Sequence, residues 1–203
     1  MQVLLPDTVN EVRVIYDESE RMNEDEFYDV CVANPDLRIE RNAQGELIIV
    51  APAGAESDSR NVELVYQLAA WAKRDRGGRV FGPSAEFMLP DGSGYSPDAA
   101  WVSNAQLATF TRSQRRKFLG LAPEFVAEIM SPSDRLRTAQ AKMAGWMRNG
   151  VKLGWLIDAD HQTVYVYGAG SARARKHTGI RKLAGEGPLT GFELELTDIW
   201  AGL

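Results

Sequence analysis

The sequence predicts an α/β protein in which helices cover the faces of a mixed sheet. Short apolar runs bounded by turn residues alternate with longer segments whose apolar residues recur at helical spacing. The chain shows no internal repeat, low-complexity tract or linker between domains. Its 203 residues, 44% of them hydrophobic, suffice for one domain with a sizeable core.

The first expected elements are a helix and a hairpin. Asn23, followed by three acidic residues, is typical of a helix start, and Asn34-Pro35 ends that helix. The segments 37–40 and 46–50 flank the turn residues 42–45, a pattern that predicts two paired strands.

Two longer helices and a series of strands follow. Candidate caps at 57–59 predict a helix that runs to about Arg74. Ser133 or Asp134 is expected to cap a second helix, which Asn149-Gly150 closes. The expected strands lie, in chain order, within 79–81, 86–89, 95–102, 125–130, 151–157, 163–167 and 192–196, with a polar, partly helical insert over about 103–118.

Composition argues against several classes of protein. The single cysteine, Cys31, excludes an internal disulfide, and with only His161 and His177 beside it a structural zinc site is not expected. No stretch approaches the roughly 20 apolar residues of a membrane span or resembles a signal peptide, so we expect a cytoplasmic protein with no membrane partner. The net charge of −5 argues against a protein that coats DNA, although enzymes can contact phosphate through local basic patches.

The most informative residue is Glu128, which lies inside the apolar run 125–130. An isolated carboxylate in a buried strand is costly unless a cation, a metal ion or hydrogen-bond donors compensate it. A second acid, Asp98, precedes another apolar segment, 99–102. Lys142, on the helix after Glu128, borders that helix's apolar face.

Two carboxylates on strands and a nearby lysine are the groups that metal-assisted cleavage of a phosphodiester requires. We therefore expect a divalent-metal nuclease in which Asp98 and Glu128 bind Mg²⁺, for which Mn²⁺ can substitute. Lys142 would orient or activate the attacking water and stabilise negative charge. Glu63, on the first long helix, could supply a third acid.

Each of these residues also has a simpler interpretation. Asp98 could be an ordinary turn acid, and Glu128 could form a buried salt bridge with Arg135 or Lys142. Lys142 could carry its charge to solvent along the helix flank, and Glu63 could be an exposed helix residue.

Several ordered blocks along most of the chain carry a family resemblance. They are Arg60-Asn61 with Glu63, Ser96-Pro97-Asp98-Ala99-Ala100-Trp101-Val102, Pro123-Glu124-Phe125-Val126-Ala127-Glu128, Ser131-Pro132-Ser133-Asp134, Lys142-Met143, and Asn149-Gly150-Val151 leading to Gly154-Trp155-Leu156-Ile157-Asp158. In these blocks the chain resembles the Uma-type endonucleases, a restriction-endonuclease-like family within the PD-(D/E)xK nuclease superfamily.

This resemblance implies a restriction-endonuclease-like mixed central sheet flanked by helices, a magnesium site, and a nuclease activity that in this family is mostly inferred. We accordingly expect a single domain over 1–203, with an N-terminal helix and hairpin over about 1–55 and a nuclease core over about 56–203.

The resemblance also assigns roles to residues. Asp98 takes the place of the superfamily's first strand aspartate, and Glu128 that of the acid in the (D/E)xK half-motif. Two residues later the superfamily has lysine and this chain has Met130, so Lys142 is expected to replace it, as in the rest of the family, with Glu63 as an extra catalytic acid. Glu40 also aligns with a family acid, but a surface acid at a strand edge is the simpler interpretation.

The leading hypothesis is an endonuclease that hydrolyses phosphodiester bonds, with DNA as the expected substrate, and that forms a homodimer by analogy with other restriction-like folds. The alternative is a non-catalytic module with the same fold that binds protein or nucleic acid. A hydrolase of another phosphate ester is a third hypothesis. No sequence feature separates DNA from RNA, because that choice depends on groove and base contacts.

Overall fold

A computed structural model describes residues 2–4, 11–17, 20–171 and 173–203. The chain forms two compact units, each drawn from separate stretches of sequence. The first unit comprises Met1–Pro52, Glu86–Ser96 and Thr111–Leu121. The second unit comprises Ala53–Ala85, Pro97–Phe110 and Ala122–Leu203. The expected single domain stays a prediction, although the second unit draws all but three of its residues from the expected core range 56–203.

The described residues of the first unit form a six-stranded sheet, the α-helix α1 and a short 3₁₀ helix. Its elements are β1 (Gln2–Leu4), β2 (Glu11–Ile15), α1 (Glu24–Ala33), β3 (Arg38–Arg41), β4 (Leu47–Val50), β6 (Phe87–Met88), β7 (Gly94–Tyr95) and the 3₁₀ helix η2 (Gln114–Arg116). The strands follow the order β1-β2-β4-β3-β7-β6. Asn23 caps α1 as predicted, because its side chain accepts the Glu26 amide while the Glu26 carboxylate accepts the Asn23 amide.

The second unit is built on a mixed six-stranded sheet. Its elements are α2 (Ala55–Asp75), β5 (Gly78–Phe81), β8 (Ala99–Ser103), α3 (Asn104–Ala108), β9 (Phe125–Ile129), α4 (Leu136–Arg148), β10 (Leu153–Asp158), β11 (Thr163–Gly168), β12 (Arg175–Thr178), β13 (Lys182–Ala184), η3 (Gly187–Leu189), β14 (Glu193–Glu195) and α5 (Thr197–Ala201). The strand order is β12-β11-β10-β9-β8-β5, in which β9 and β10 are parallel and the other pairs are antiparallel. This mixed sheet confirms the predicted α/β class.

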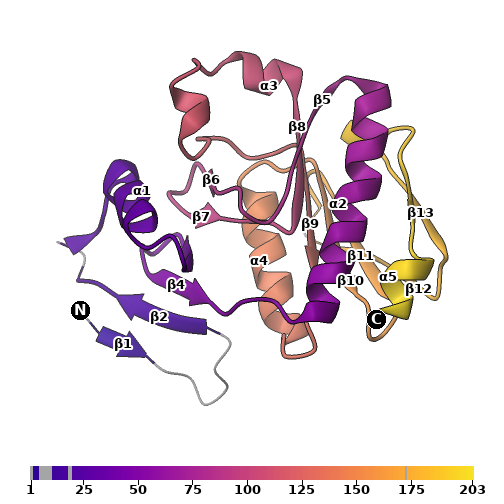
Figure 1. Ribbon diagram of the computed structural model, residues 1–203, viewed down its shortest axis with the longest axis horizontal. Coiled ribbons are helices and arrows are strands. Elements are labelled where there is room, and N and C mark those ends of the chain that lie inside the picture. The colour runs from indigo at the N-terminus through magenta and orange to yellow at the C-terminus, as the bar shows by residue number, and fades with distance from the viewer. Residues whose placement is uncertain (1, 5–10, 18–19, 172) are drawn as a thin grey trace. The chain divides into compact units, whose positions relative to one another are not determined.

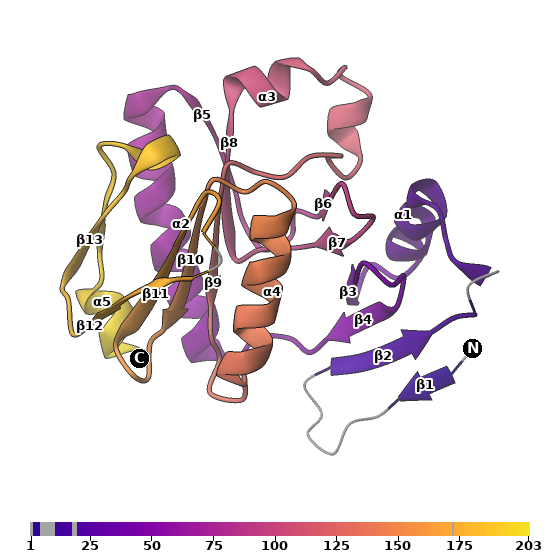
Figure 2. The same ribbon diagram turned by 180° about the vertical axis from the view of Figure 1, so that it is seen from behind.

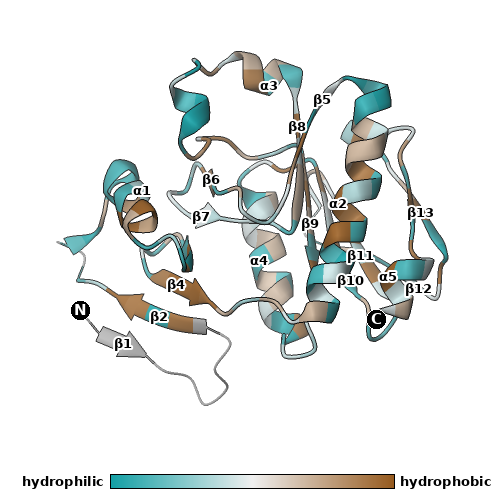
Figure 3. Ribbon diagram, viewed as in Figure 1, coloured by the Kyte–Doolittle hydropathy of each residue, from teal (hydrophilic) through white to brown (hydrophobic). Residues whose placement is uncertain are grey.

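The helices α2 and α4 lie on either side of this sheet (Figures 1 and 2). Side chains of β9 alternate between the two helices. Phe125 and Ala127 join the core cluster that contains Leu64 and Leu68 of α2, whereas Glu128 contacts α4. Hydrophobic and hydrophilic residues alternate along α2, as expected for a helix with one buried face (Figure 3). Glu128 is therefore the charged residue of a strand whose five residues are all buried.

The predicted starts of the two long helices are wrong by a few residues. α2 begins at Ala55, after Gly54, so 57–59 lie within its first turns. α4 begins at Leu136, and its N-cap Arg135 makes no side-chain capping bond. The Asp134 carboxylate instead accepts the Ser131 amide at 2.8 Å and closes the preceding turn. The Asp134 side chain therefore stabilises the turn and does not cap the helix.

Candidate active site

The register of β8 and β9 brings the two predicted acids to one end of the sheet. These antiparallel strands pair Ala99 with Ala127 and Ala100 with Val126. Continued by one residue, the register sets Asp98 opposite Glu128. Asp98 immediately precedes β8, so it lies just beyond the last pair of this register. Both are buried, with exposed fractions of 7% for Asp98 and 8% for Glu128.

Asp98 receives hydrogen bonds on both carboxylate oxygens. The Ile129 amide donates to Oδ2 at 2.8 Å, so the side chain continues the hydrogen bonding between the strands just before β8 begins. Asn61 of α2 donates from Nδ2 to Oδ1 at 3.2 Å. A buried main-chain amide and a buried side-chain amide thus hold the Asp98 carboxylate in place. This degree of support exceeds what an ordinary surface turn requires.

Glu128 receives two donors from α4 on a single oxygen. Lys142 Nζ lies 3.0 Å from Glu128 Oε1, and Trp146 Nε1 donates to the same oxygen at 2.9 Å. The two donors are four residues apart, which is about one helical turn, so both project toward β9. Of the two partners expected for Glu128, Arg135 or Lys142, the structure brings Lys142 to the carboxylate.

The ability of the two acids to hold a metal ion depends on the oxygen atoms near them. Among the residues that the structure describes, no group of three or more His, Cys, Asp or Glu side chains gathers in a way that could hold a metal ion. Next to Asp98, however, Asn61 Oδ1 is buried and makes no hydrogen bond. Two carboxylates and an unpaired amide oxygen are hard donors of the kind that Mg²⁺ accepts, and Mg²⁺ usually retains water for its remaining positions.

Comparison with known proteins places this chain in a family. The family model "Uma2: Putative restriction endonuclease" matches residues 24–197. The chain belongs to the Uma2 family. A similar solved structure is that of "a putative nuclease belonging to DUF820" from Anabaena variabilis ATCC 29413, with a TM-score of 0.71 and 20% identity over 89% of this chain and 98% of that one. The likeness confirms the predicted restriction-endonuclease-like fold. No curated protein matches the chain significantly.

In this Uma2 chain, Met130 follows directly after β9, two residues beyond Glu128. The half-motif described above has a lysine at that position. Lys142 supplies an amine from α4 instead, with its side chain 24% exposed. The amine that contacts Glu128 therefore comes from a helix residue, Lys142, and not from position 130.

Glu63 lies elsewhere on α2. At 100° per residue it is about 200° around the helix from Asn61, whose side chain contacts Asp98. The Glu63 carboxylate accepts a hydrogen bond from Gln67 at 2.8 Å. Gln67 in turn exchanges two hydrogen bonds with the main chain of Glu195 in β14. These contacts join Glu63 to the α2–β14 packing, and its role as a further catalytic acid stays a prediction.

Glu40 belongs to the first unit and is not the surface acid expected from the sequence. Its exposed fraction is 4%, because the Ser96 amide donates to its Oε1 at 3.2 Å and Arg38 lies 3.6 Å from the same oxygen. The Ser96 hydroxyl donates to Glu86 at 2.6 Å. Arg38 lies two residues before Glu40 on the same strand, but Ser96 comes from a distant segment, and the sequence pattern gave no sign of that contact.

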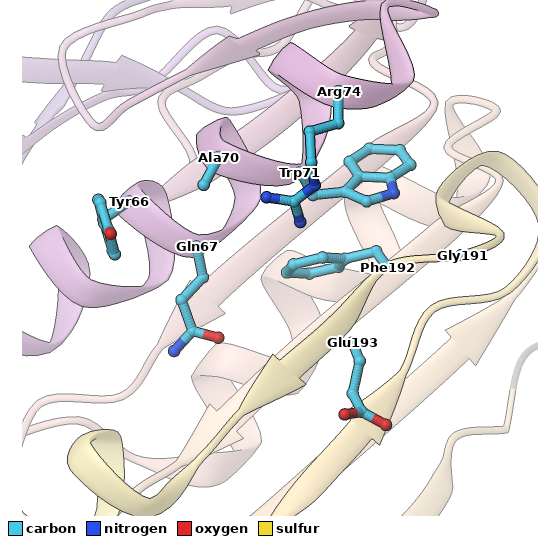
Figure 4. A pocket seen from close by; sticks show the side chains of 8 residues that line it. All are labelled: Tyr66, Gln67, Ala70, Trp71, Arg74, Gly191, Phe192 and Glu193. Carbon is cyan, nitrogen blue, oxygen red and sulfur yellow. The ribbon is translucent and has the colours of Figure 1, made fainter.

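A surface cavity of about 270 Å³ lies between α2 and β14 (Figure 4). Its walls are Tyr66, Gln67, Ala70, Trp71, Arg74, Gly191, Phe192 and Glu193. This lining includes none of the predicted site residues. The candidate site is therefore formed by residues of the sheet and of α4 and does not include this cavity.

Sequence reasoning missed two residues that contact the acids. The spacing of Trp146 places it on the apolar face of α4, yet its indole N–H donates a hydrogen bond to Glu128. Asn61 belongs to a block shared with the family, but nothing in its spacing pairs it with Asp98. The one available signal was that Trp146 lies four residues after Lys142, on the same side of the helix.

Proposed function

We propose that this chain is a divalent-metal-dependent endonuclease that hydrolyses phosphodiester bonds, with DNA as its substrate. Asp98 and Glu128 are its metal-binding acids, and Lys142 is its catalytic amine. The observation that carries the proposal is the 3.0 Å contact between Lys142 and Glu128, on a strand whose register sets Glu128 opposite Asp98. Membership of a family described as restriction endonucleases supports the same activity.

The residues around the acids fit a magnesium ion. Asp98 and Glu128 would hold it, with the unpaired Oδ1 of Asn61 as a further oxygen donor nearby. When bound, the ion supplies positive charge to the scissile phosphate and acidifies a water molecule. Mn²⁺ prefers the same oxygen donors and should replace it.

The remaining chemistry belongs to side chains of this chain. Hydrolysis forms a bond from a water oxygen to phosphorus, breaks the bond from phosphorus to the leaving oxygen, and returns a proton to that oxygen. Lys142, held beside Glu128, provides positive charge for the phosphate and orients the water. The Ile129 amide and Asn61 keep Asp98 oriented, so less reorganisation is needed when substrate binds.

Plasmid cleavage tests this function. Purified protein should nick or linearise supercoiled DNA with Mg²⁺ or Mn²⁺ but not with EDTA, and Asp98→Asn should abolish the activity. Glu124→Gln is the matched control, because Glu124 precedes the same strand and pairs with Lys152 instead of Lys142. Cleavage that persists in Asp98→Asn, or its absence with every divalent metal and with RNA as well as DNA, contradicts the proposal.

The second candidate is a non-catalytic module that binds protein or nucleic acid. The same ion pair favours it, because a lysine at 3.0 Å is also what a purely structural buried carboxylate would require. A metal-independent gel shift of DNA, together with unchanged stability on adding Mn²⁺, would support this candidate against the nuclease.

Other expectations stay predictions. Glu63→Gln should reduce plasmid cleavage if Glu63 is a further catalytic acid, and should leave it unchanged if its bond to Gln67 is its whole role. A homodimer is expected by analogy, and light scattering coupled to gel filtration measures it. Among the described residues, none of the helices is long and apolar enough to cross a membrane. A cytoplasmic location is proposed as well.

A further inference from the structure

The feature that carries a further inference is the indole of Trp146. This residue of α4 is fully buried, with an exposed fraction of 0%, and its Nε1 donates to Glu128 Oε1 at 2.9 Å. An indole N–H is a donor only and carries no charge. Trp146 therefore supports the carboxylate without neutralising it.

This hydrogen bond is not a general consequence of burying tryptophan in this unit. Trp101 and Trp155 are also buried, and the Nε1 of each makes no hydrogen bond. The surrounding core thus contains two indole groups whose N–H is left unpaired. Trp146 differs from them in pointing its N–H at a candidate catalytic acid.

The two donors on Glu128 differ in freedom. Lys142 has a long side chain that is 24% exposed, so its amine can follow a substrate phosphate. The Trp146 ring is enclosed and cannot turn away without opening the packing of α4. Because both donors bind Oε1, Trp146 continues to fix the orientation of the carboxylate when Lys142 moves.

We infer that Trp146 is a positioning residue, which holds the Glu128 carboxylate in the orientation that binds a divalent metal ion. The inference rests on the proposed function and adds to it a neutral residue on the helix that carries Lys142. Supporting donors behind metal-binding groups commonly change metal affinity about 10-fold to 100-fold when removed. A tryptophan that only filled space would have no such effect.

The decisive comparison is between Trp146→Phe and Trp155→Phe. Both substitutions shorten a fully buried indole in the same unit, but only the first removes a hydrogen bond. Calorimetric titration with Mn²⁺ alone, without nucleic acid, should show about 10-fold or greater loss of affinity in Trp146→Phe and less than about 3-fold in Trp155→Phe. Equal affinity in wild type and Trp146→Phe, or equal losses in both variants, would overturn the inference.

The titration also separates this inference from the function beneath it. If the wild-type protein binds no Mn²⁺, the proposed function fails and the positioning role fails with it. If wild type binds Mn²⁺ in a way that Asp98→Asn abolishes, yet Trp146→Phe binds equally well, only the positioning role fails.

A second measurement serves if Trp146→Phe does not fold. Replacing Trp146 by its benzothiophene analogue keeps the bicyclic shape and exchanges the N–H for sulfur, so the same loss of Mn²⁺ affinity is expected. In the unaltered protein, the Trp146 indole proton resonance should shift on adding Mg²⁺, and its dependence on concentration should follow metal binding. A resonance that does not respond to saturating Mg²⁺ would contradict the inference.

Discussion

Glu128→Gln distinguishes a metal-binding carboxylate from a structural ion pair, because it removes one charge with little change of shape. At 3.0 Å, and with an effective dielectric constant of about 20, the attraction between Glu128 and Lys142 is about 5.5 kcal/mol before desolvation. Repulsion from Asp98, which lies one residue beyond the last pair of β8 and β9, offsets part of it. The partial exposure of Lys142 and the relief of desolvation at Glu128 reduce the remainder further.

We therefore expect the metal-free Glu128→Gln protein to differ from wild type by less than about 2 kcal/mol in its free energy of unfolding. The effect of metal should be larger. An ion at 100 times its dissociation constant stabilises the native state by about 2.7 kcal/mol, which for a chain of this size raises the melting temperature by about 5–11 °C. Glu128→Gln should lose most of that rise.

Thermal melts followed by circular dichroism, with and without millimolar Mn²⁺, measure both quantities. Glu124→Gln is the control, since Glu124 forms an ion pair with Lys152 and should retain the full metal-dependent rise. A structural ion pair would instead make Glu128→Gln less stable by about 3–5 kcal/mol whether or not metal is present. That result, or a metal-dependent rise that survives in Glu128→Gln, would refute the assignment.

Three further predictions concern other residues. Lys142→Ala should lower the rate of DNA cleavage by about 10²–10⁴-fold with little change in far-ultraviolet circular dichroism, and a rate near wild type would exclude it as the catalytic amine. Burial, and secondarily the Glu86 carboxylate, raises the pKa of Cys31 from 9.0 to about 12. The folded protein should therefore react with Ellman's reagent at pH 8 about 10²–10³-fold more slowly than the unfolded chain. Equal reaction rates would contradict this prediction. A Cβ at Gly78 would collide with the Val102 carbonyl. Gly78→Ala should therefore lower the free energy of unfolding, measured by urea titration, by about 1–3 kcal/mol. Gly82→Ala is the control, because no atom lies near the added Cβ, and it should lower that free energy by less than about 0.5 kcal/mol.

The Cys31 prediction has a defined pH window. Because folding disfavours the thiolate, the folded state holds its proton up to about pH 12 while the unfolded chain loses it near pH 9. Stability should therefore fall as the pH rises through this interval. Cys31→Ser should reduce the dependence of stability on pH there.

Most of the elements between 24 and 168 follow from the sequence, because strand and helix periodicities differ clearly there, whereas β1, β2, β12 and β13 were not expected. The hairpin of β10 and β11 was expected from two apolar runs around a polar turn, and it occurs at 153–168. Helix starts were less predictable. At the start of α2, Gly54 has no side chain that could cap the helix. Before α4, the Asp134 carboxylate accepts a hydrogen bond within a turn. Neither helix therefore begins at the polar capping residue on which the prediction relied.

The need of Glu128 for a partner was predictable for a different reason. A carboxylate within an apolar run must be compensated, so Glu128 was expected to have partners before any were known. Which partner compensates it depends on the rotation of α4, and a sequence constrains that rotation only coarsely. Asn61 was harder still, because its contact with Asp98 spans 37 positions and depends on how α2 packs on the sheet.

The position of Lys142 makes the candidate site depend on helix packing. A lysine at 130 would share the strand of Glu128, about 6.6 Å along it, and its placement would follow from the strand alone. Lys142 and Trp146 instead approach Glu128 from α4, so any shift of that helix moves both donors together. α4 comes close to β10 where Gly154 has no side chain, since a Cβ there would lie 2.5 Å from Met143 Cε. The packing of α4 on the sheet therefore determines the distance between the Lys142 amine and the Glu128 carboxylate.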